Sequence, residues 1–165
     1  MGKKANITIA FMTKEDLDQV LAIEQASFSM PWSKNLFLSE FRSPTVSTLM
    51  VALAEESVRT VLGYIVFWLI DDEMHILNLA VTPACRRLNI ARSLVLAALR
   101  LSLQKGAIRA FLEVRASNQA AQKLYSNLGF VGASVRRDYY DMPVEDAVIM
   151  VLDKGAFMSI SAQNG

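Results

Sequence analysis

The sequence contains only one cysteine, Cys85, and only one histidine, His75. A single cysteine cannot form a disulfide bond within the chain, which is typical of proteins kept in a reducing cytoplasm. One cysteine and one histidine are also too few for a zinc cluster, so we expect no metal site. His75 lies in an apolar segment with strand character, which argues against a serine–histidine–aspartate triad.

The chain also lacks an excess of charge and a long hydrophobic run. Lysine and arginine total 17 and aspartate and glutamate total 16, which leaves a net charge of +1. Such a balance argues against a dedicated nucleic-acid-binding protein, because it provides no general basic field. The longest apolar run, residues 64–70, is far shorter than the roughly 20 residues of a membrane-spanning helix. No N-terminal segment has the form of a signal peptide, so we expect a cytoplasmic protein that binds neither membranes nor nucleic acid.

The composition is that of a folded protein with a substantial core. Hydrophobic residues make up 53% of the 165 residues, and charged residues make up 20%. This length and composition predict one globular domain. We assign residues 1–155 to that domain and expect residues 156–165 to be a frayed tail.

Hydrophobic periodicity and capping residues predict elements in the order β-α-α-β-β-β-α-β-α-β-β. Strands are expected at residues 7–11, 48–55, 62–70, 74–81, 110–114, 130–140 and 145–153, and helices at 13–28, 34–42, 89–105 and 118–128. The segment 62–70 shows no polar alternation, which indicates a central strand covered on both faces. The element order predicts an α/β fold with a mixed, mostly antiparallel sheet of about seven strands and about four helices on both faces.

The junction between the expected strand 74–81 and the helix 89–105 carries the sequence RRLNIARS. The first turn of a helix has unpaired N–H groups and partial positive charge, which together with Arg86 and Arg87 would suit a pyrophosphate group. Asn89 tolerates left-handed backbone angles better than most residues other than glycine. Taken alone, however, this junction is more typical of a surface loop with two solvated arginines.

The wider segment HILNLAVTPACRRLNIARSLV, residues 75–95, resembles the acetyl-CoA-binding segment of the GNAT (GCN5-related) acetyltransferases. In that family an aliphatic strand is followed by a loop of the form Arg/Gln-x-x-Gly-x-Gly/Ala. Arg86, Leu88, Asn89 and Ala91 fall in this frame, and Asn89 stands where the family usually has glycine. The resemblance implies the GNAT fold and acetyl-CoA as cosubstrate.

Three further segments resemble the ribosomal-protein-alanine N-acetyltransferases and related protein N-terminal acetyltransferases within that family. They are IEQASFSMPWS (23–33), LEVRASNQAAQKLYSNLGF (112–130) and RRDYYDMPVEDAVIM (136–150). The resemblance implies transfer of an acetyl group from acetyl-CoA to the α-amino group of a peptide, with ribosomal protein S18 as the first acceptor to test. Two alternatives remain: acetylation of lysine or small-molecule amines, and a non-catalytic acyl-CoA-binding regulator.

The resemblance also implies a set of site residues. Those for acetyl-CoA are Leu79, Ala80, Val81, Arg86, Arg87, Leu88, Asn89, Ile90, Ala91, Arg92, Asn118 and Tyr125. Those for the acceptor peptide are Glu24, Pro31, Trp32, Tyr139 and Tyr140.

Two residues are expected to carry the chemistry. The resemblance makes Glu113 the general base, because the acceptor ammonium, with a pKa of about 8, must lose a proton. It makes Tyr125 the general acid that protonates the departing thiolate. From local sequence alone, Glu113 would more often be a surface glutamate paired with Arg115, and Tyr125 an amphipathic residue packed beside its leucine neighbours.

Overall fold

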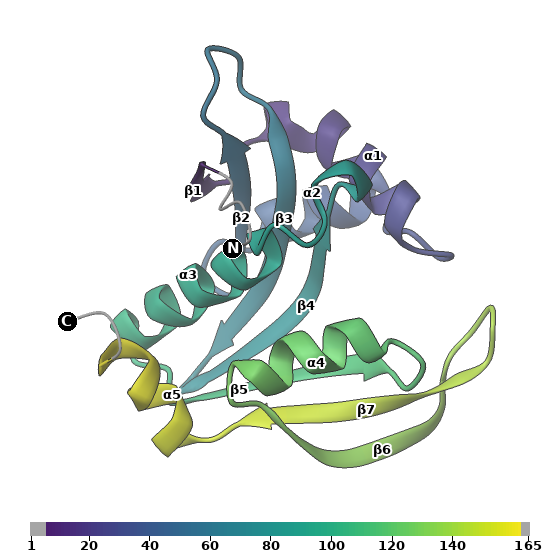
Figure 1. Ribbon diagram of the computed structural model, residues 1–165, viewed down its shortest axis with the longest axis vertical. Coiled ribbons are helices and arrows are strands. Elements are labelled where there is room, and N and C mark those ends of the chain that lie inside the picture. Colours follow the sequence, from purple (N-terminus) through teal and green to yellow (C-terminus); the bar gives the residue numbers. More distant parts are fainter. Residues whose placement is uncertain (1–5, 163–165) are drawn as a thin grey trace. The chain divides into compact units, whose positions relative to one another are not determined.

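The computed structural model describes residues 6–162 and shows a mixed α/β architecture (Figure 1). The strands are β1 (Ile7–Phe11), β2 (Ser47–Ala54), β3 (Val61–Ile70), β4 (Glu73–Val81), β5 (Arg109–Arg115), β6 (Val131–Tyr140) and β7 (Glu145–Leu152). The helices are α1 (Leu17–Ser27), α2 (Lys34–Phe41), α3 (Ile90–Gln104), α4 (Gln119–Asn127) and α5 (Lys154–Ala162), with short 3-10 turns η1 (Lys14–Asp16) and η2 (Pro83–Cys85). The predicted element order is confirmed, and α5 is added at its end.

The strands are hydrogen-bonded in the order β1-β2-β3-β4-β5-β7-β6. The pairs β1–β2, β2–β3, β5–β7 and β6–β7 are antiparallel. Residues 73–76 of β4 pair in parallel with residues 109–112 of β5. This arrangement confirms the predicted mixed, mostly antiparallel sheet of seven strands.

The chain divides into two compact units. The first contains the chain up to Trp68 together with residues 78–98, and the second contains residues 69–77 and the chain from Leu99 onward. Strands β3 and β4 and helix α3 therefore contribute residues to both units.

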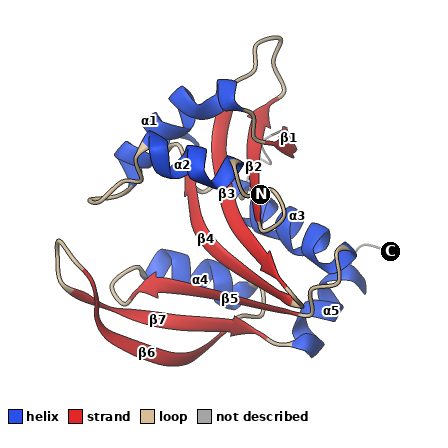
Figure 2. Ribbon diagram, turned by 180° about the vertical axis from the view of Figure 1, so that it is seen from behind, coloured by secondary structure: helices blue, strands red, loops and turns tan. Residues whose placement is uncertain are grey.

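In the first unit, strand β3 is covered on both faces, as its unbroken apolar sequence predicted. Figures 1 and 2 show α1 and α2 on one face of β2 and β3, and α3 on the other. The ring of Tyr64 meets the ring of Phe37 of α2 edge-on, with centroids 5.8 Å apart. The adjacent Gly63 faces α3, where an added Cβ would lie 2.9 Å from the carbonyl oxygen of Ala80 and 3.3 Å from Leu94 Cδ1. Glycine is therefore required for the close approach of β3 to β4 and α3.

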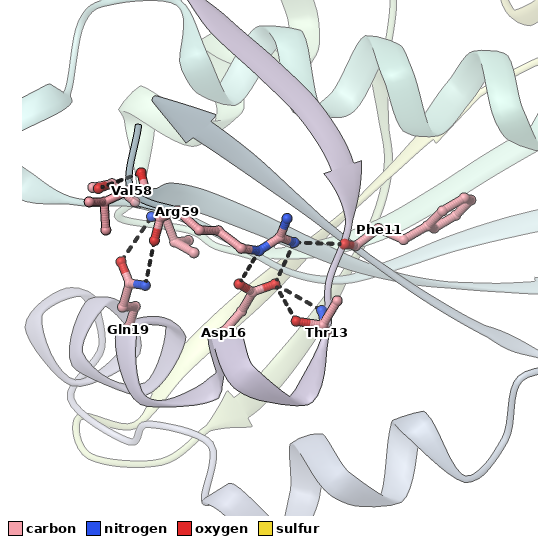
Figure 3. A network of polar contacts seen from close by, with 8 residues as sticks. Phe11, Thr13, Asp16, Gln19, Val58 and Arg59 are labelled. Atoms are coloured by element: carbon pink, nitrogen blue, oxygen red, sulfur yellow. Dashed lines mark hydrogen bonds and ion pairs between the residues drawn. The ribbon is translucent and has the colours of Figure 1, made fainter. Parts of the chain in front are cut away.

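A polar network ties the connection between β2 and β3 to the start of α1 (Figure 3). The buried carboxylate of Asp16 accepts hydrogen bonds from the Thr13 N–H at 2.8 Å and from Arg59 Nε at 2.7 Å. The amide of Gln19 donates to the Arg59 carbonyl at 3.1 Å and accepts from the Val61 N–H at 2.9 Å. Burial raises the pKa of Asp16, but the hydrogen bonds and the charge of Arg59 outweigh burial and hold that pKa below its ordinary value.

In the second unit, the end of the chain differs from the prediction. We expected a frayed tail over residues 156–165, but residues 156–162 belong to α5, and residues 163–165 lie outside the described part of the chain. Asp153 precedes this helix, and its carboxylate caps the first turn by accepting a hydrogen bond from the Ala156 N–H at 2.9 Å. Phe157 and Ile160 are buried, so the segment is held by packing as well as by its cap.

Candidate active site

The loop between β4 and α3 has a backbone geometry that suits an anion. Arg87 and Asn89 both have left-handed backbone angles, with φ of 63° and 61°, and α3 begins at the next residue, Ile90. A left-handed residue followed by a right-handed one, as Asn89 is followed by the helical Ile90, turns successive N–H groups toward one side, which is an anion-binding arrangement. The first N–H groups of α3 add donors that no helical carbonyl uses. The backbone of residues 86–91 therefore fits a pyrophosphate group.

The two arginines of this loop have different surroundings. Arg86 Nε donates to the Val81 carbonyl oxygen at 3.3 Å, and its terminal nitrogen donates to the Ser27 hydroxyl at 3.3 Å. Its guanidinium thus ties the loop to the end of β4 and to α1. Both arginines are exposed, but only Arg86 makes side-chain hydrogen bonds within the described residues, so Arg87 is the freer of the two guanidinium groups.

The remaining residues predicted for the coenzyme are mostly packed in the first unit. Ala80, Val81 and Ile90 are buried. Leu79, Leu88, Ala91 and Arg92 are half-buried. These side chains define the shape of the strand end and the loop, which leaves the backbone as the polar surface.

Glu24 is a buried carboxylate at the centre of a second polar network. Its side chain is enclosed in the first unit, where Oε1 accepts from the Trp32 N–H at 2.9 Å. Oε2 accepts from the Asn78 amide at 2.9 Å and from the Tyr64 hydroxyl. Burial raises the pKa of Glu24, against the opposing effect of the bonds from Trp32 and Asn78. Both oxygens are therefore engaged within the protein.

Sequence reasoning missed two members of the Glu24 network, Tyr64 and Asn78. Asn78 is the only polar residue within the apolar run 76–81, and this interruption was a usable signal. Tyr64 had no comparable signal, because a tyrosine in an apolar strand is common in cores.

The predicted acceptor residues Pro31 and Trp32 lie in the connection between α1 and α2. Pro31 is exposed and Trp32 is half-buried. The Trp32 ring is tilted against Phe37, with centroids 5.2 Å apart. The Ser33 hydroxyl accepts from the Leu36 N–H at 3.2 Å, which confirms the predicted cap of α2.

In the second unit, strand β5 places Glu113 on its more exposed face. Ala110, Leu112 and Val114 are buried on the opposite face, so the predicted alternation is confirmed. The Glu113 side chain is 35% exposed and lies 3.9 Å from a terminal nitrogen of Arg136. Arg115, the partner considered from sequence, instead pairs with Glu145 at 3.7 Å.

Tyr125 lies on α4, whose limits follow from local sequence. The Asn118 side chain accepts from the Ala121 N–H at 3.1 Å and caps the helix, and Gly129 follows its end with φ of 100°. Tyr125 is buried and meets Phe130 edge-on at 5.5 Å. Burial, and then the nearby phenol of Tyr140, raise the pKa of Tyr125 far above its ordinary value. The phenol therefore keeps its proton at neutral pH.

Tyr139 and Tyr140 end strand β6 as an edge-to-face pair with centroids 5.0 Å apart. The Arg115 guanidinium lies over the Tyr140 ring, 4.4 Å from its centroid. Burial, and then the charge of Glu113, raise the pKa of Tyr140 to about 12, against the opposing charge of Arg115. Tyr140 is thus electrostatically coupled to both Glu113 and Tyr125.

The predicted residues fall into two groups, one in each unit. The first unit contains the loop 86–92, the strand end 79–81 and the acceptor residues Glu24, Pro31 and Trp32. The second contains Glu113, Asn118, Tyr125, Tyr139 and Tyr140. Within residues 6–162 no three histidine, cysteine, aspartate or glutamate side chains gather as metal ligands. None of the helices described has the length and apolar character needed to cross a membrane.

Comparison with known proteins shows which family shares these features. Residues 17–130 match the Acetyltransferase (GNAT) family. A relative from Haemophilus ducreyi, named [ribosomal protein bS18]-alanine N-acetyltransferase, is 33% identical over 87% of this chain and 98% of its own.

Solved structures agree with the sequence matches. The ribosomal-protein-S18-alanine N-acetyltransferase from Escherichia coli superposes with a TM-score of 0.81 and 31% identity, over 90% of this chain and 94% of its own. Arabidopsis thaliana NAA60 in complex with acetyl-CoA has the same fold, with a TM-score of 0.81 and 16% identity over 91% of this chain and 99% of its own. This chain therefore belongs to the GNAT acetyltransferase family and is an acetyl-CoA-dependent N-acetyltransferase, as its sequence motifs predicted.

Proposed function

We propose that this enzyme acetylates the α-amino group of a protein N-terminus, and that the N-terminal alanine of ribosomal protein S18 is its acceptor. The observation that carries the proposal is that the second unit holds an accessible carboxylate, Glu113 on β5, and a buried phenol, Tyr125 on α4. Amine acetylation needs one group to accept a proton and another to donate one. The S18 acceptor is supported by the names of the Haemophilus and Escherichia relatives.

The base in this proposal is Glu113. Its carboxylate accepts a proton from the acceptor ammonium, directly or through one water, and so frees the nitrogen lone pair for attack. The exposed face of β5 makes the carboxylate reachable by a substrate, and Arg136 at 3.9 Å is a weak enough partner to be displaced.

The acid is Tyr125. When bound, acetyl-CoA supplies an acetyl thioester, and its sulfur needs a proton as it leaves. Burial raises the pKa of Tyr125 above its ordinary value, so the phenol keeps its proton at neutral pH and well into the alkaline range. The phenol therefore enters each cycle in its donating form.

The residues proposed for the coenzyme are the backbone of residues 79–81 and the loop 86–92 in the first unit, and Asn118 in the second unit. The left-handed residues Arg87 and Asn89 and the first turn of α3 support pyrophosphate binding. Arg87 is placed to add a charged contact, whereas Arg86 holds the loop in shape. Asn118 caps α4 with its side-chain oxygen and keeps its amide nitrogen as a donor.

The residues proposed for the acceptor are Pro31 and Trp32 in the first unit, where Glu24 bonds to the Trp32 N–H, and Tyr139 and Tyr140 in the second unit. Exposed or half-exposed aromatic and proline side chains suit the binding of an extended chain terminus. Because both oxygens of Glu24 are engaged by Trp32, Tyr64 and Asn78, Glu24 supports the acceptor by fixing the connection between α1 and α2.

The same reasoning extends to organisation and location. We propose that the chain through α5 acts as one acetyltransferase domain, since the relatives match across both compact units. The expected limit at residue 155 moves to the end of α5 because Phe157 and Ile160 are buried. An S18 acceptor would place the enzyme with ribosomes in the cytoplasm, and a chain with one cysteine suits that compartment.

The test is a competition between acceptor amines. The purified enzyme receives acetyl-CoA and two peptides, one with the S18 N-terminus free and one with that terminus blocked and an internal lysine exposed. Mass spectrometry should show acetyl groups on the free α-amine only. Preferential labelling of lysine would instead assign the enzyme to ε-amine acetylation, and coenzyme binding without turnover would make it a regulator.

Glu113→Gln should lower turnover by about 100-fold at neutral pH, with partial recovery at higher pH, where more acceptor is already deprotonated. The matched control is Glu73→Gln, a surface carboxylate at the start of β4. An unchanged rate for Glu113→Gln would show that another group is the base.

A further inference from the structure

Arg115 ends strand β5 and directs its guanidinium at the turn between β6 and β7. One terminal nitrogen donates to the Pro143 carbonyl at 3.2 Å, and the other donates to the Asp141 carbonyl at 3.0 Å. The same group lies 3.7 Å from the Glu145 carboxylate, and the Arg115 side chain is 24% exposed. One side chain therefore engages two residues of the turn and the first residue of β7.

The turn has little apolar packing of its own. Met142 is 67% exposed and Val144 is 66% exposed. Since exposed side chains bury little surface, hydrophobic burial contributes little to the shape of residues 141–144. The backbone carbonyls that Arg115 binds are thus a main determinant of that shape, because charge-assisted bonds are stronger than neutral ones.

Arg115 also begins a row of stacked side chains. Its guanidinium covers the Tyr140 ring at 4.4 Å, and Tyr140 meets Tyr139 edge-on at 5.0 Å. Glu145, the anionic partner of Arg115, is itself fixed by the Ser117 hydroxyl at 2.8 Å. The Tyr140 ring is therefore held directly by the Arg115 guanidinium, whereas Tyr139 contacts Tyr140 and lies 5.7 Å from the Arg136 guanidinium.

We propose that Arg115 is a positioning residue for the acceptor peptide: it holds the β6–β7 turn and the Tyr140 ring in the arrangement that the incoming chain binds. This inference rests on the proposed function in assigning Tyr139 and Tyr140 to the acceptor. Lysine cannot replace Arg115 fully, because a single ammonium lacks the planar fork that reaches two carbonyls while stacking on a ring.

Kinetics of Arg115→Lys and Arg115→Ala test the proposal. The matched control is Arg109→Ala, on the same strand, whose guanidinium pairs with Asp72 at 3.5 Å and Glu73 at 3.3 Å. In both Arg115 variants the KM for the peptide should rise about tenfold, with kcat and coenzyme affinity changed less than about twofold. Arg109→Ala should match the wild type. A loss confined to kcat, or equal changes in the Arg109 and Arg115 variants, would overturn the proposal.

Hydrogen exchange supplies a readout that needs no substrate. The backbone amides of residues 139–146 should exchange faster in Arg115→Ala than in wild type and Arg109→Ala, while those of α4 stay unchanged. Unchanged exchange in the turn would overturn the positioning role even if activity fell. If the wild-type enzyme acetylates no peptide terminus while the turn still loosens, the proposed function fails and the structural role of Arg115 stands.

Discussion

Burial determines the chemistry available to Tyr125. In water a phenol begins to lose its proton above pH 9, but Tyr125 is enclosed and its pKa is raised by burial and by the neighbouring Tyr140. A group that must be protonated to act works over a wider range of pH when its pKa rises. The sequence placed this tyrosine on a helix, but only its packing explains why its pKa lies above the ordinary value.

A pH profile and one substitution test this account. For wild-type enzyme with saturating peptide, kcat should not fall between pH 8 and about pH 10, because Tyr125 and Tyr140 both keep their protons there. Tyr125→Phe should reduce kcat by about 100-fold with little change in coenzyme affinity. An alkaline fall near pH 9 that Tyr125→Phe abolishes would contradict the raised pKa.

Ser47 is a buried residue with an unsatisfied side chain. Its hydroxyl oxygen has no hydrogen-bond partner among the described residues. Such a group costs about 1–3 kcal/mol, so Ser47→Ala should raise the free energy of unfolding by about 1 kcal/mol in urea titrations. Ser33→Ala removes the cap of α2 and should lower the free energy of unfolding by about 1 kcal/mol. Equal destabilisation by both changes would show that the Ser47 hydroxyl does have a favourable interaction.

At the scale of elements, the limits of the helices were readable from single residues. Ser33 and Asn118 cap α2 and α4, and Gly129 with φ of 100° ends the latter. These capping residues act over a few residues, so they can be recognised from the sequence without knowledge of the fold. Helix α5 was missed because its stability depends on burial of Phe157 and Ile160, which no local pattern revealed.

The loop before α3 gives a prediction for Asn89. Its φ of 61° is a left-handed angle that glycine adopts freely and a β-branched residue resists. Asn89→Gly should bind coenzyme A as tightly as wild type or more tightly. Asn89→Val should bind about tenfold more weakly, because the left-handed angle costs about 1–2 kcal/mol. Isothermal calorimetry measures both, and a collapse of affinity in Asn89→Gly would show that the asparagine side chain itself contacts the ligand.

At the scale of the whole molecule, stability should depend on pH through Asp16. The pKa of Asp16 is lowered in the folded protein. Its contribution to the free energy of unfolding is therefore complete above the pKa of the unfolded state, about 4, and is lost as the pH falls through the pKa of the folded state. Asp16→Asn should therefore lower the free energy of unfolding by about 1–3 kcal/mol at pH 7, and the difference should shrink as the pH falls below 4.

Asp18→Asn is the matched control for this experiment. Asp18 is 91% exposed and lies 3.8 Å from Lys34, and such surface pairs contribute little. Asp18→Asn should leave the free energy of unfolding nearly unchanged from pH 3 to pH 7. A gap between wild type and Asp16→Asn that stays constant over this range would show that the Asp16 carboxylate does not titrate on unfolding as described.

The sequence by itself determined the element order, most helix limits and the family, because periodicity, caps and motifs are local properties of the chain. It also placed Glu113 and Tyr125 on their strand and helix. Only the tertiary structure decided which residues meet: Glu24 with Trp32, Tyr64 and Asn78, and Glu113 with Arg136 instead of Arg115. These contacts join residues far apart in the chain, and they follow from strand register and helix packing, which no short segment specifies.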